Sequence, residues 1–187
     1  MILMRHGESE FNVVYSATRT DPGIEDPALT EDGRAQVADA AAKLVSKDTA
    51  ITRIIASPYT RALQSAEILA DTLAAPIIVE PLVRERFAWT CDIGTGASVL
   101  AARWPNPVFP EMAERWWPDD IESPDAVFDR AGAFHRAMIE DPDHNETLVV
   151  SHWGFIRALC GLEVTNAAMV RVRLGAAVEV VSHPHPC

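Results

Sequence analysis

A short apolar run, Met1 to Met4, stops at the basic pair Arg5 and His6, and Gly7 follows at once. Such a run predicts a short buried strand, and the glycine permits a sharp turn out of it. Arg5 and His6 would then lie at the carboxyl end of a strand, where open α/β sheets bind their ligands. A neutral imidazole can act as a nucleophile, and a guanidinium favours a phosphate-like anion. The alternative is a basic pair that is merely solvated.

Strand-like and helix-like segments alternate along the chain. Ser57 and Ser123 each precede a proline, and both are expected to cap a helix. The expected helices cover residues 30–47, 57–73, 123–138 and 155–162. The expected strands cover residues 51–56, 76–80 and 147–151, with a terminal hairpin or strand at 170–181. This alternation predicts an α/β fold: a three-layer sandwich whose mostly parallel central sheet is flanked by helices.

Two segments lack this periodicity. Residues 9–29 are rich in turn-forming residues and predict a loop that lies over a site. Residues 82–123 contain several prolines and most of the tryptophans, with one short helix expected near residues 97–103. We therefore expect one domain, residues 1–187, with a cap-like insertion at about 86–123 folded over the site.

Composition limits the classes of partner. The net charge of −11 argues against non-specific binding to nucleic acid or to an anionic membrane. Any phosphate site must therefore gather its basic residues locally. Cys91, Cys160 and Cys187 show no paired spacing, as expected of reduced thiols, and the apolar start is too short for a signal peptide. A cytoplasmic location is the expectation, and the sequence carries no signal for an oligomeric state.

Three junctions between a strand and the following helix carry basic or imidazole groups. They are Arg5 with His6, Arg61 just after Ser57, and His152 after the strand 147–151. Because the carboxyl ends of parallel strands meet at one edge of a sheet, these groups can converge on one anion-binding pocket. Alone, His152 would be better explained as a core histidine and Arg61 as a solvated helix residue.

Several motifs, in order over roughly residues 2–160, resemble those of the histidine phosphatase superfamily (phosphoglycerate mutase-like), in its small phosphatase branch. The segments that carry this resemblance are Arg5-His6-Gly7-Glu8 with Asn12, Leu29-Thr30 with Gly33 and Gln36, Ser57 to Ala66, Leu82 to Glu85, and Val150-Ser151-His152. Ordered matches at sensible spacing are far more specific than any one of them.

Chemistry and the resemblance together imply a role for each residue. His6 would attack phosphorus and form a phosphohistidine. Arg5, Arg61 and His152 would hold the phosphoryl oxygens, and the resemblance adds Asn12 as a phosphate contact.

Glu85 would protonate the leaving alcohol and then activate water. Asp92, Glu80 and Glu25 are alternative acids, and the run from Arg84 to Arg86 could instead be a surface charge run.

The favoured hypothesis is a phosphomonoester hydrolase that needs no metal or other cofactor and acts on a small-molecule phosphomonoester. A phosphoglycerate mutase is the first alternative, and a non-catalytic module that binds phosphorylated ligands is the second. The insertion is aromatic and acidic, which favours a substrate whose non-phosphate part is apolar or neutral.

Overall fold

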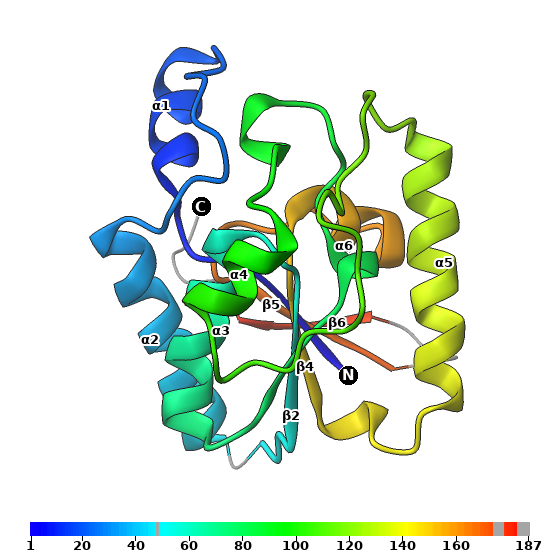
Figure 1. Cartoon of the computed structure of the whole chain (residues 1–187). Coiled ribbons are helices and arrows are strands. Elements are labelled where there is room, and N and C mark those ends of the chain that lie inside the picture. Colours follow the sequence, from blue (N-terminus) through cyan, green and yellow to red (C-terminus); the bar gives the residue numbers. More distant parts are fainter. Residues whose placement is uncertain (48, 174–177, 183–187) are drawn as a thin grey trace.

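The computed structural model describes residues 1–47, 49–173 and 178–182, and its centre is a six-stranded sheet in the order β3-β2-β4-β1-β5-β6 (Figure 1). The first four strands in this order are parallel to one another. Strand β5 pairs antiparallel with β1, and β6 pairs antiparallel with β5. The strands are β1 (Ile2–Arg5), β2 (Arg53–Ala56), β3 (Ile77–Val79), β4 (Thr147–Ser151), β5 (Met169–Val172) and β6 (Val178–Ser182). The terminal hairpin or strand expected at 170–181 corresponds to β5 and β6, two antiparallel strands, while residues 174–177 of that segment lie outside the described residues.

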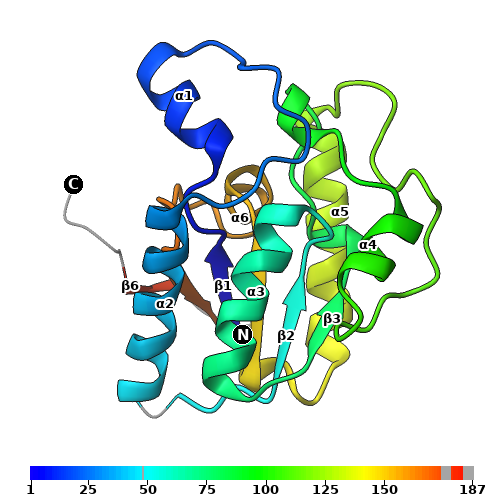
Figure 2. The same cartoon turned by 60° about the vertical axis from the view of Figure 1, so that its left-hand side comes forward.

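Helices cover both faces of the sheet, which confirms the predicted three-layer α/β fold (Figure 2). One face carries α2 (Glu31–Ser46), α3 (Thr60–Leu73) and α4 (Ala97–Arg103), and the other carries α5 (Pro124–Glu140) and α6 (Trp153–Cys160). Strand β1 is buried on both faces: Ile2 and Met4 pack on the first, and Leu3 packs on the second. A continuous apolar run is what a strand buried on both sides requires.

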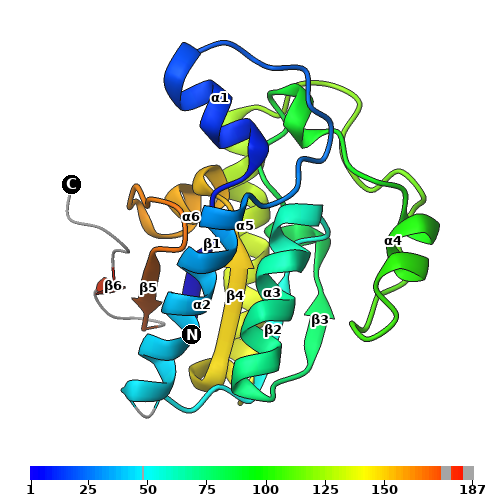
Figure 3. The ribbon, with the colours of Figure 1, turned by 90° about the vertical axis from the view of Figure 1, so that its left-hand side faces the viewer.

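The prediction of a loop over residues 9–29 is wrong at its start. Helix α1 (Glu10–Thr18) begins after Ser9, whose side chain accepts a hydrogen bond from the Asn12 backbone while the Asn12 side chain accepts one from the Ser9 backbone. This reciprocal capping satisfies two donors that a helix start leaves free, so a nine-residue helix forms without a long apolar stripe. Helix α1 stands above the carboxyl ends of the parallel strands (Figure 3).

The expected cap of the second helix is also wrong. Helix α3 begins at Thr60 after Tyr59, whose side chain makes no capping hydrogen bond, and Asp26 Oδ1 instead accepts the Thr60 N–H at 2.8 Å. Ser57 and Pro58 precede the helix, and the Ser57 hydroxyl instead contacts His152. Ser123 does cap α5, as predicted.

Residues 82–123 divide into two parts. The first follows the single-turn helix η1 (Pro81–Val83) and includes η2 (Thr90–Asp92). The second contains α4 in its predicted position and packs on the β3 side, where Val108 bridges to Ile78. Leu100 and Trp104 are buried in the same core as α3. Trp104 therefore packs in this core rather than over the strand ends.

Gly7 serves close packing rather than an unusual turn conformation. Its φ lies outside the left-handed region, but a Cβ on Gly7 would collide with the Gly33 carbonyl, and a Cβ on Gly33 would collide with Glu8. Glycine at both positions lets the segment after β1 contact the start of α2 directly.

Candidate functional site

The register of the sheet places two histidines side by side. Arg5 is the partner of Ser151 across β1 and β4, so His6 and His152 each follow a paired residue at the same sheet edge. The His6 backbone N–H donates to the Ser151 carbonyl at 3.0 Å. The centroids of the two imidazole rings are 5.0 Å apart, and the residues are 3% and 0% exposed. The structure thus brings together two of the predicted site residues.

A hydrogen bond assigns the tautomer of His6. Its Nδ1 lies 2.7 Å from the Gly7 carbonyl oxygen, which only accepts, so Nδ1 carries the proton. The Nε2 atom then keeps a lone pair as long as the ring is neutral. Burial, together with the Arg61 and Arg5 charges, lowers the pKa of His6 well below its ordinary value. His6 is therefore a neutral imidazole with its nucleophilic nitrogen free.

Arg61 lies in the first turn of α3 and is fixed from the far side of its guanidinium. Its Nη1 donates to the Cys91 carbonyl at 2.8 Å, and its Nη2 pairs with Asp92 Oδ1 at 3.3 Å. The guanidinium carbon also lies 4.4 Å from the centroid of the Tyr59 ring. Such a buried, oriented cation suits an anionic ligand better than a mobile surface arginine would.

Two buried nitrogens of the site have no partner within the described residues: Arg5 Nε and His152 Nδ1. The Arg5 Nη1 donates to the Val164 carbonyl at 2.9 Å, and burial lowers the Arg5 pKa to about 10, which leaves the group charged at neutral pH. Buried polar atoms without partners are rare in proteins, and at such a position they can bind a ligand, an ion or a water molecule. An anion between Arg5, Arg61 and His152 would satisfy both nitrogens.

Ser57 is a site residue that the sequence analysis assigned to a helix cap. Its Oγ lies 2.8 Å from His152 Nε2. When the hydroxyl donates to Nε2, the proton of a neutral His152 is on Nδ1, the nitrogen that has no protein partner. Burial, then the Arg61 charge, lowers the pKa of His152 well below its ordinary value, so the neutral ring predominates.

The structure separates the candidate acids. Glu85 lines the pocket and its carboxylate accepts the Gly154 N–H at 3.0 and 3.1 Å and the Arg86 N–H at 2.7 Å. Glu80 accepts the Leu82 N–H outside this pocket, and Glu25 is exposed and does not line it. Of the acids considered from the sequence, only Glu85 and Asp92 reach the pocket.

Asp92 lines the pocket, but it is 1% exposed and both of its oxygens have partners. Its Oδ1 faces Arg61, and its Oδ2 accepts the N–H groups of Ala88 and Trp89 at 3.0 Å each. Burial and the Glu85 charge raise the pKa of Asp92 to about 6 against the lowering effect of Arg61. The carboxylate therefore holds Arg61 on one side and the 88–89 backbone on the other.

Asn12 lines the pocket, and its side-chain oxygen already accepts three hydrogen bonds. Oδ1 accepts from the Ser9 backbone, from the Ser9 hydroxyl and from Asn166 Nδ2. Asn166, which the sequence gave no signal for, also donates to the His6 and Gly7 carbonyls at 3.2 Å. In the part of the chain that the structure describes, no partner occupies the Asn12 Nδ2 group, so it can donate to a ligand.

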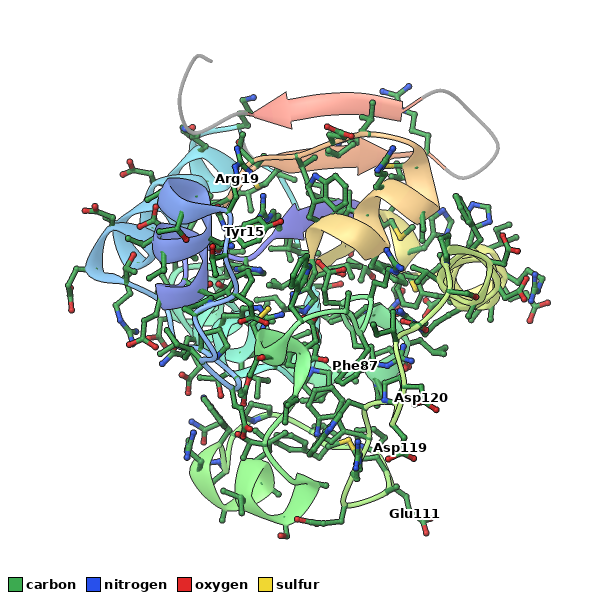
Figure 4. The ribbon with its side chains drawn as sticks, turned by 90° about the horizontal axis from the view of Figure 1, so that it is seen from above. Tyr15, Arg19, Phe87, Glu111, Asp119 and Asp120 are labelled. Carbon is green, nitrogen blue, oxygen red and sulfur yellow. The ribbon has the colours of Figure 1, made fainter. Side chains whose placement is uncertain are left out.

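The pocket above these groups has a volume of about 610 Å³. Its mouth is lined by aromatic residues of three elements and by two further arginines. These are Phe11 and Tyr15 of α1, Trp89 before η2, Trp153 of α6, and Arg19 and Arg86. Seen from above, Tyr15 of α1 and Arg19, which follows α1, lie on one side, whereas the labelled acids Glu111, Asp119 and Asp120 lie beyond Phe87 and away from α1 (Figure 4).

Two further observations concern the described residues alone. They contain no group of three or more histidine, cysteine or acidic side chains placed to hold a metal ion. None of their helices combines the length and the apolar character needed to cross a membrane.

The chain belongs to the histidine phosphatase superfamily (branch 1), whose family model matches residues 1–183. A probable phosphoglycerate mutase GpmB of Cronobacter sakazakii is 37% identical over 161 residues, or 80% of this chain and 67% of that protein. The GpmB protein of Erwinia tasmaniensis is 37% identical over 83 residues, and the match spans only 36% of its length.

Solved structures share the fold. The ecdysone phosphate phosphatase from Bombix mori, in complex with tungstate, has a TM-score of 0.70 at 18% identity, covering 100% of this chain and 93% of its own. The mycobacterial glucosyl-3-phosphoglycerate phosphatase has a TM-score of 0.61 at 22% identity, covering 91% and 87%. At these identities the likeness concerns the fold alone.

Proposed function

We propose that the protein is a phosphomonoester hydrolase that works through a phosphohistidine on His6 and needs no metal ion. The observation that supports this most is the pairing of a neutral imidazole with a cluster of anion-binding groups. His6 Nε2 keeps its lone pair, and among the described residues the buried Arg5 Nε and His152 Nδ1 have no protein partner. Phosphoryl transfer depends mainly on positioning and charge stabilisation, which such a site supplies.

In the first step the His6 Nε2 lone pair attacks phosphorus and the bond from phosphorus to the alcohol oxygen breaks. Arg5 and Arg61 stabilise the charge on the phosphoryl oxygens, His152 donates through Nδ1–H, and Asn12 donates through its amide. Protonated Glu85 gives its proton to the departing alkoxide, so a neutral alcohol leaves.

In the second step the same carboxylate, now ionised, removes a proton from water. The water oxygen attacks phosphorus, the bond from phosphorus to nitrogen breaks, and its electron pair returns to His6 Nε2. Inorganic phosphate leaves and Glu85 is protonated again. Asp92 takes no proton in this scheme: it positions Arg61 and the 88–89 backbone, and it is only 1% exposed, whereas Glu85 is half-buried.

Phosphoglycerate mutase activity is the second candidate. It is the name given to several curated relatives, and Arg19 and Arg86 line the pocket mouth, where they could contact a second anionic group. A mutase would return the phosphoryl group from His6 to a second hydroxyl instead of to water.

The test is chemical trapping with EDTA present. The protein is mixed with ³²P-labelled p-nitrophenyl phosphate or 3-phosphoglycerate and quenched in alkali, where phosphohistidine survives. We expect labelled protein, burst release of nitrophenol and then inorganic phosphate, with His6→Ala lowering all three by about 10³-fold or more.

Each alternative gives a different result. Transfer of label from 3-phosphoglycerate to an isomeric phosphoglycerate faster than phosphate release would identify a mutase. Tight binding of phosphate without any labelled protein would identify a binding module.

A further inference from the structure

The mouth of the pocket is lined by several aromatic rings. Phe11 and Tyr15 are stacked with ring centroids 5.3 Å apart, and the Trp89 ring follows at 5.4 Å, tilted by 57° against Tyr15. Trp153 lines the pocket from a different element, α6. Apolar walls with a few placed polar groups are typical of sites for small molecules.

Trp89 leaves much of its surface uncovered although it is held in place. It is 45% exposed while it lines the pocket. Its backbone N–H donates to Asp92, and the next residue, Thr90, donates through both its N–H and its hydroxyl to Asp21, each at 2.9 Å. These bonds fix the backbone at Trp89, and an exposed aromatic ring on a fixed backbone at a pocket mouth can stack on a ligand.

One carboxylate joins this aromatic wall to the phosphate end. Asp92 Oδ1 faces Arg61, and Asp92 Oδ2 accepts the Ala88 and Trp89 amides. The position of the Trp89 backbone relative to the arginine that would hold a phosphate is therefore fixed. A ligand that binds both would meet a cationic group and an aromatic ring carried by segments that one carboxylate links.

The charges at the mouth disfavour a cationic ligand. Arg19 and Arg86 line the pocket, and Arg19 lies 5.9 Å from the Tyr15 ring centroid, so this ring already has a cation beside it. Aromatic walls also bind quaternary ammonium groups, but a further cation here would be repelled by these arginines.

We propose that the substrate is the phosphate ester of an aromatic alcohol, whose ring stacks on Tyr15 and Trp89 while its phosphate lies between Arg5 and Arg61. This inference rests on the proposed function and adds the class of leaving group. The sequence led us to expect that the insertion would supply the aromatic groups. Among the residues that line the pocket, α1 instead supplies Phe11 and Tyr15, and the insertion supplies Trp89.

The test compares esters of similar intrinsic reactivity. Benzyl phosphate and 2-naphthylmethyl phosphate are compared with ethyl phosphate, phosphocholine and 3-phosphoglycerate, all of which release an alkyl-type alcohol. We expect kcat/KM for the two aromatic esters to exceed that for ethyl phosphate by about tenfold, the worth of one good aromatic contact. Phosphocholine should be no better than ethyl phosphate.

Variants locate the effect. Trp89→Ala and Tyr15→Ala should each lower kcat/KM for benzyl phosphate about tenfold more than for ethyl phosphate. Trp89→Phe, which keeps a ring, should restore most of the preference. Phe128→Ala removes an aromatic ring of α5 that is 57% exposed and lies outside the pocket, and it should leave kcat/KM unchanged for both esters.

A binding measurement keeps the inference separate from the proposed reaction. Benzylphosphonate and methylphosphonate cannot be hydrolysed, and their dissociation constants should differ about tenfold in the wild type and less in Trp89→Ala. Equal affinities, or a preference for 3-phosphoglycerate that Trp89→Ala leaves intact, would overturn the aromatic ester. Tight benzylphosphonate binding without hydrolysis of any ester would instead contradict the proposed function alone.

Discussion

The two ends of the pocket are built in different ways. The end that we propose holds phosphate, the phosphate end, takes its groups from the ends of β1 and β4 and from the segment that leads from β2 into α3. The register of the sheet places most of them, and all but Arg5 are buried. The mouth takes its groups from α1, from residues 85–92 and from the start of α6, and carboxylates such as Asp21 and Asp92 tie these segments together. The phosphate end is thus set by the core of the fold, whereas the mouth is set by a few polar links on its surface.

This difference implies a division of labour. A change at the phosphate end should affect every ester alike, because every substrate presents the same phosphate. A change at the mouth should affect only those esters whose alcohol reaches it. Proteins that share such a fold can therefore keep one chemistry and differ in substrate.

The largest effect is expected at Arg61. Arg61→Ala should lower kcat/KM by about 10³-fold for ethyl and benzyl phosphate alike, because a buried cation that stabilises the transferring phosphoryl group is lost. Steady-state kinetics on both esters measure this. Arg136→Ala, an exposed arginine of α5, is the matched control. A loss confined to one ester would show that the two ends of the pocket are not separate.

The next largest effect is expected when the proposed acid, Glu85, is replaced. This experiment also tests the choice of Glu85 over Asp92. In single turnovers, Glu85→Gln should slow phosphohistidine formation about 10²- to 10³-fold with ethyl phosphate. It should have a much smaller effect with p-nitrophenyl phosphate, since nitrophenolate leaves without a proton.

Asp92→Asn is the comparison for that measurement. Because Asp92 holds Arg61 in position, Asp92→Asn should slow phosphohistidine formation from both esters to the same extent. If Asp92→Asn instead shows the dependence on leaving group and Glu85→Gln does not, the acid is Asp92.

Ser57 should have a moderate effect through His152. Ser57→Ala should lower kcat/KM about tenfold, the cost of one buried hydrogen bond, and Ser57→Thr should restore most of it. ¹⁵N NMR of the histidine rings reports which nitrogen of His152 carries the proton. An unchanged tautomer in Ser57→Ala would leave Ser57 with a packing role only.

The smallest expected effect concerns the free energy of unfolding and involves Asp92, which links the two ends of the pocket. The Asp92 pKa of about 6 lies above that of an ordinary aspartate, about 4 in an unfolded chain. Between these values the folded chain binds more protons, so the contribution of this carboxyl to the free energy of unfolding falls as the pH rises from 4 to 6. Asn at this position has no such proton.

Urea unfolding of wild type and Asp92→Asn across this range measures the effect. The free energy of unfolding of the wild type minus that of the variant should fall as the pH rises. A difference that stays constant with pH would place the Asp92 pKa near its ordinary value.

The sequence predicted the phosphate end far better than the mouth. Arg5, His6 and His152 follow apolar runs that can only be buried strands, so local sequence and sheet topology together brought them to one edge. Ser57 was misassigned because a serine before a proline is a good helix cap, and only tertiary structure shows that its hydroxyl contacts His152 instead.

The mouth depends on contacts between segments distant in sequence. The spacing of Phe11 and Tyr15, four residues apart after Ser9, was a usable signal for α1, but turn-forming residues nearby obscured it. Nothing in the sequence pairs Asp21 with Thr90 or Asn12 with Asn166. Trp116, expected in the cap, packs edge-on against Tyr59 beside the core.

Gly154 offers a practical consequence. Its N–H holds both oxygens of Glu85, and a Cβ at this position would collide with Glu85 Oε1. Gly154→Ala should displace the acid while His6, Arg5 and Arg61 keep their places. With the proposed acid displaced, the variant should bind its natural ester but hydrolyse it slowly, so it could be used to capture that ester from a cell extract.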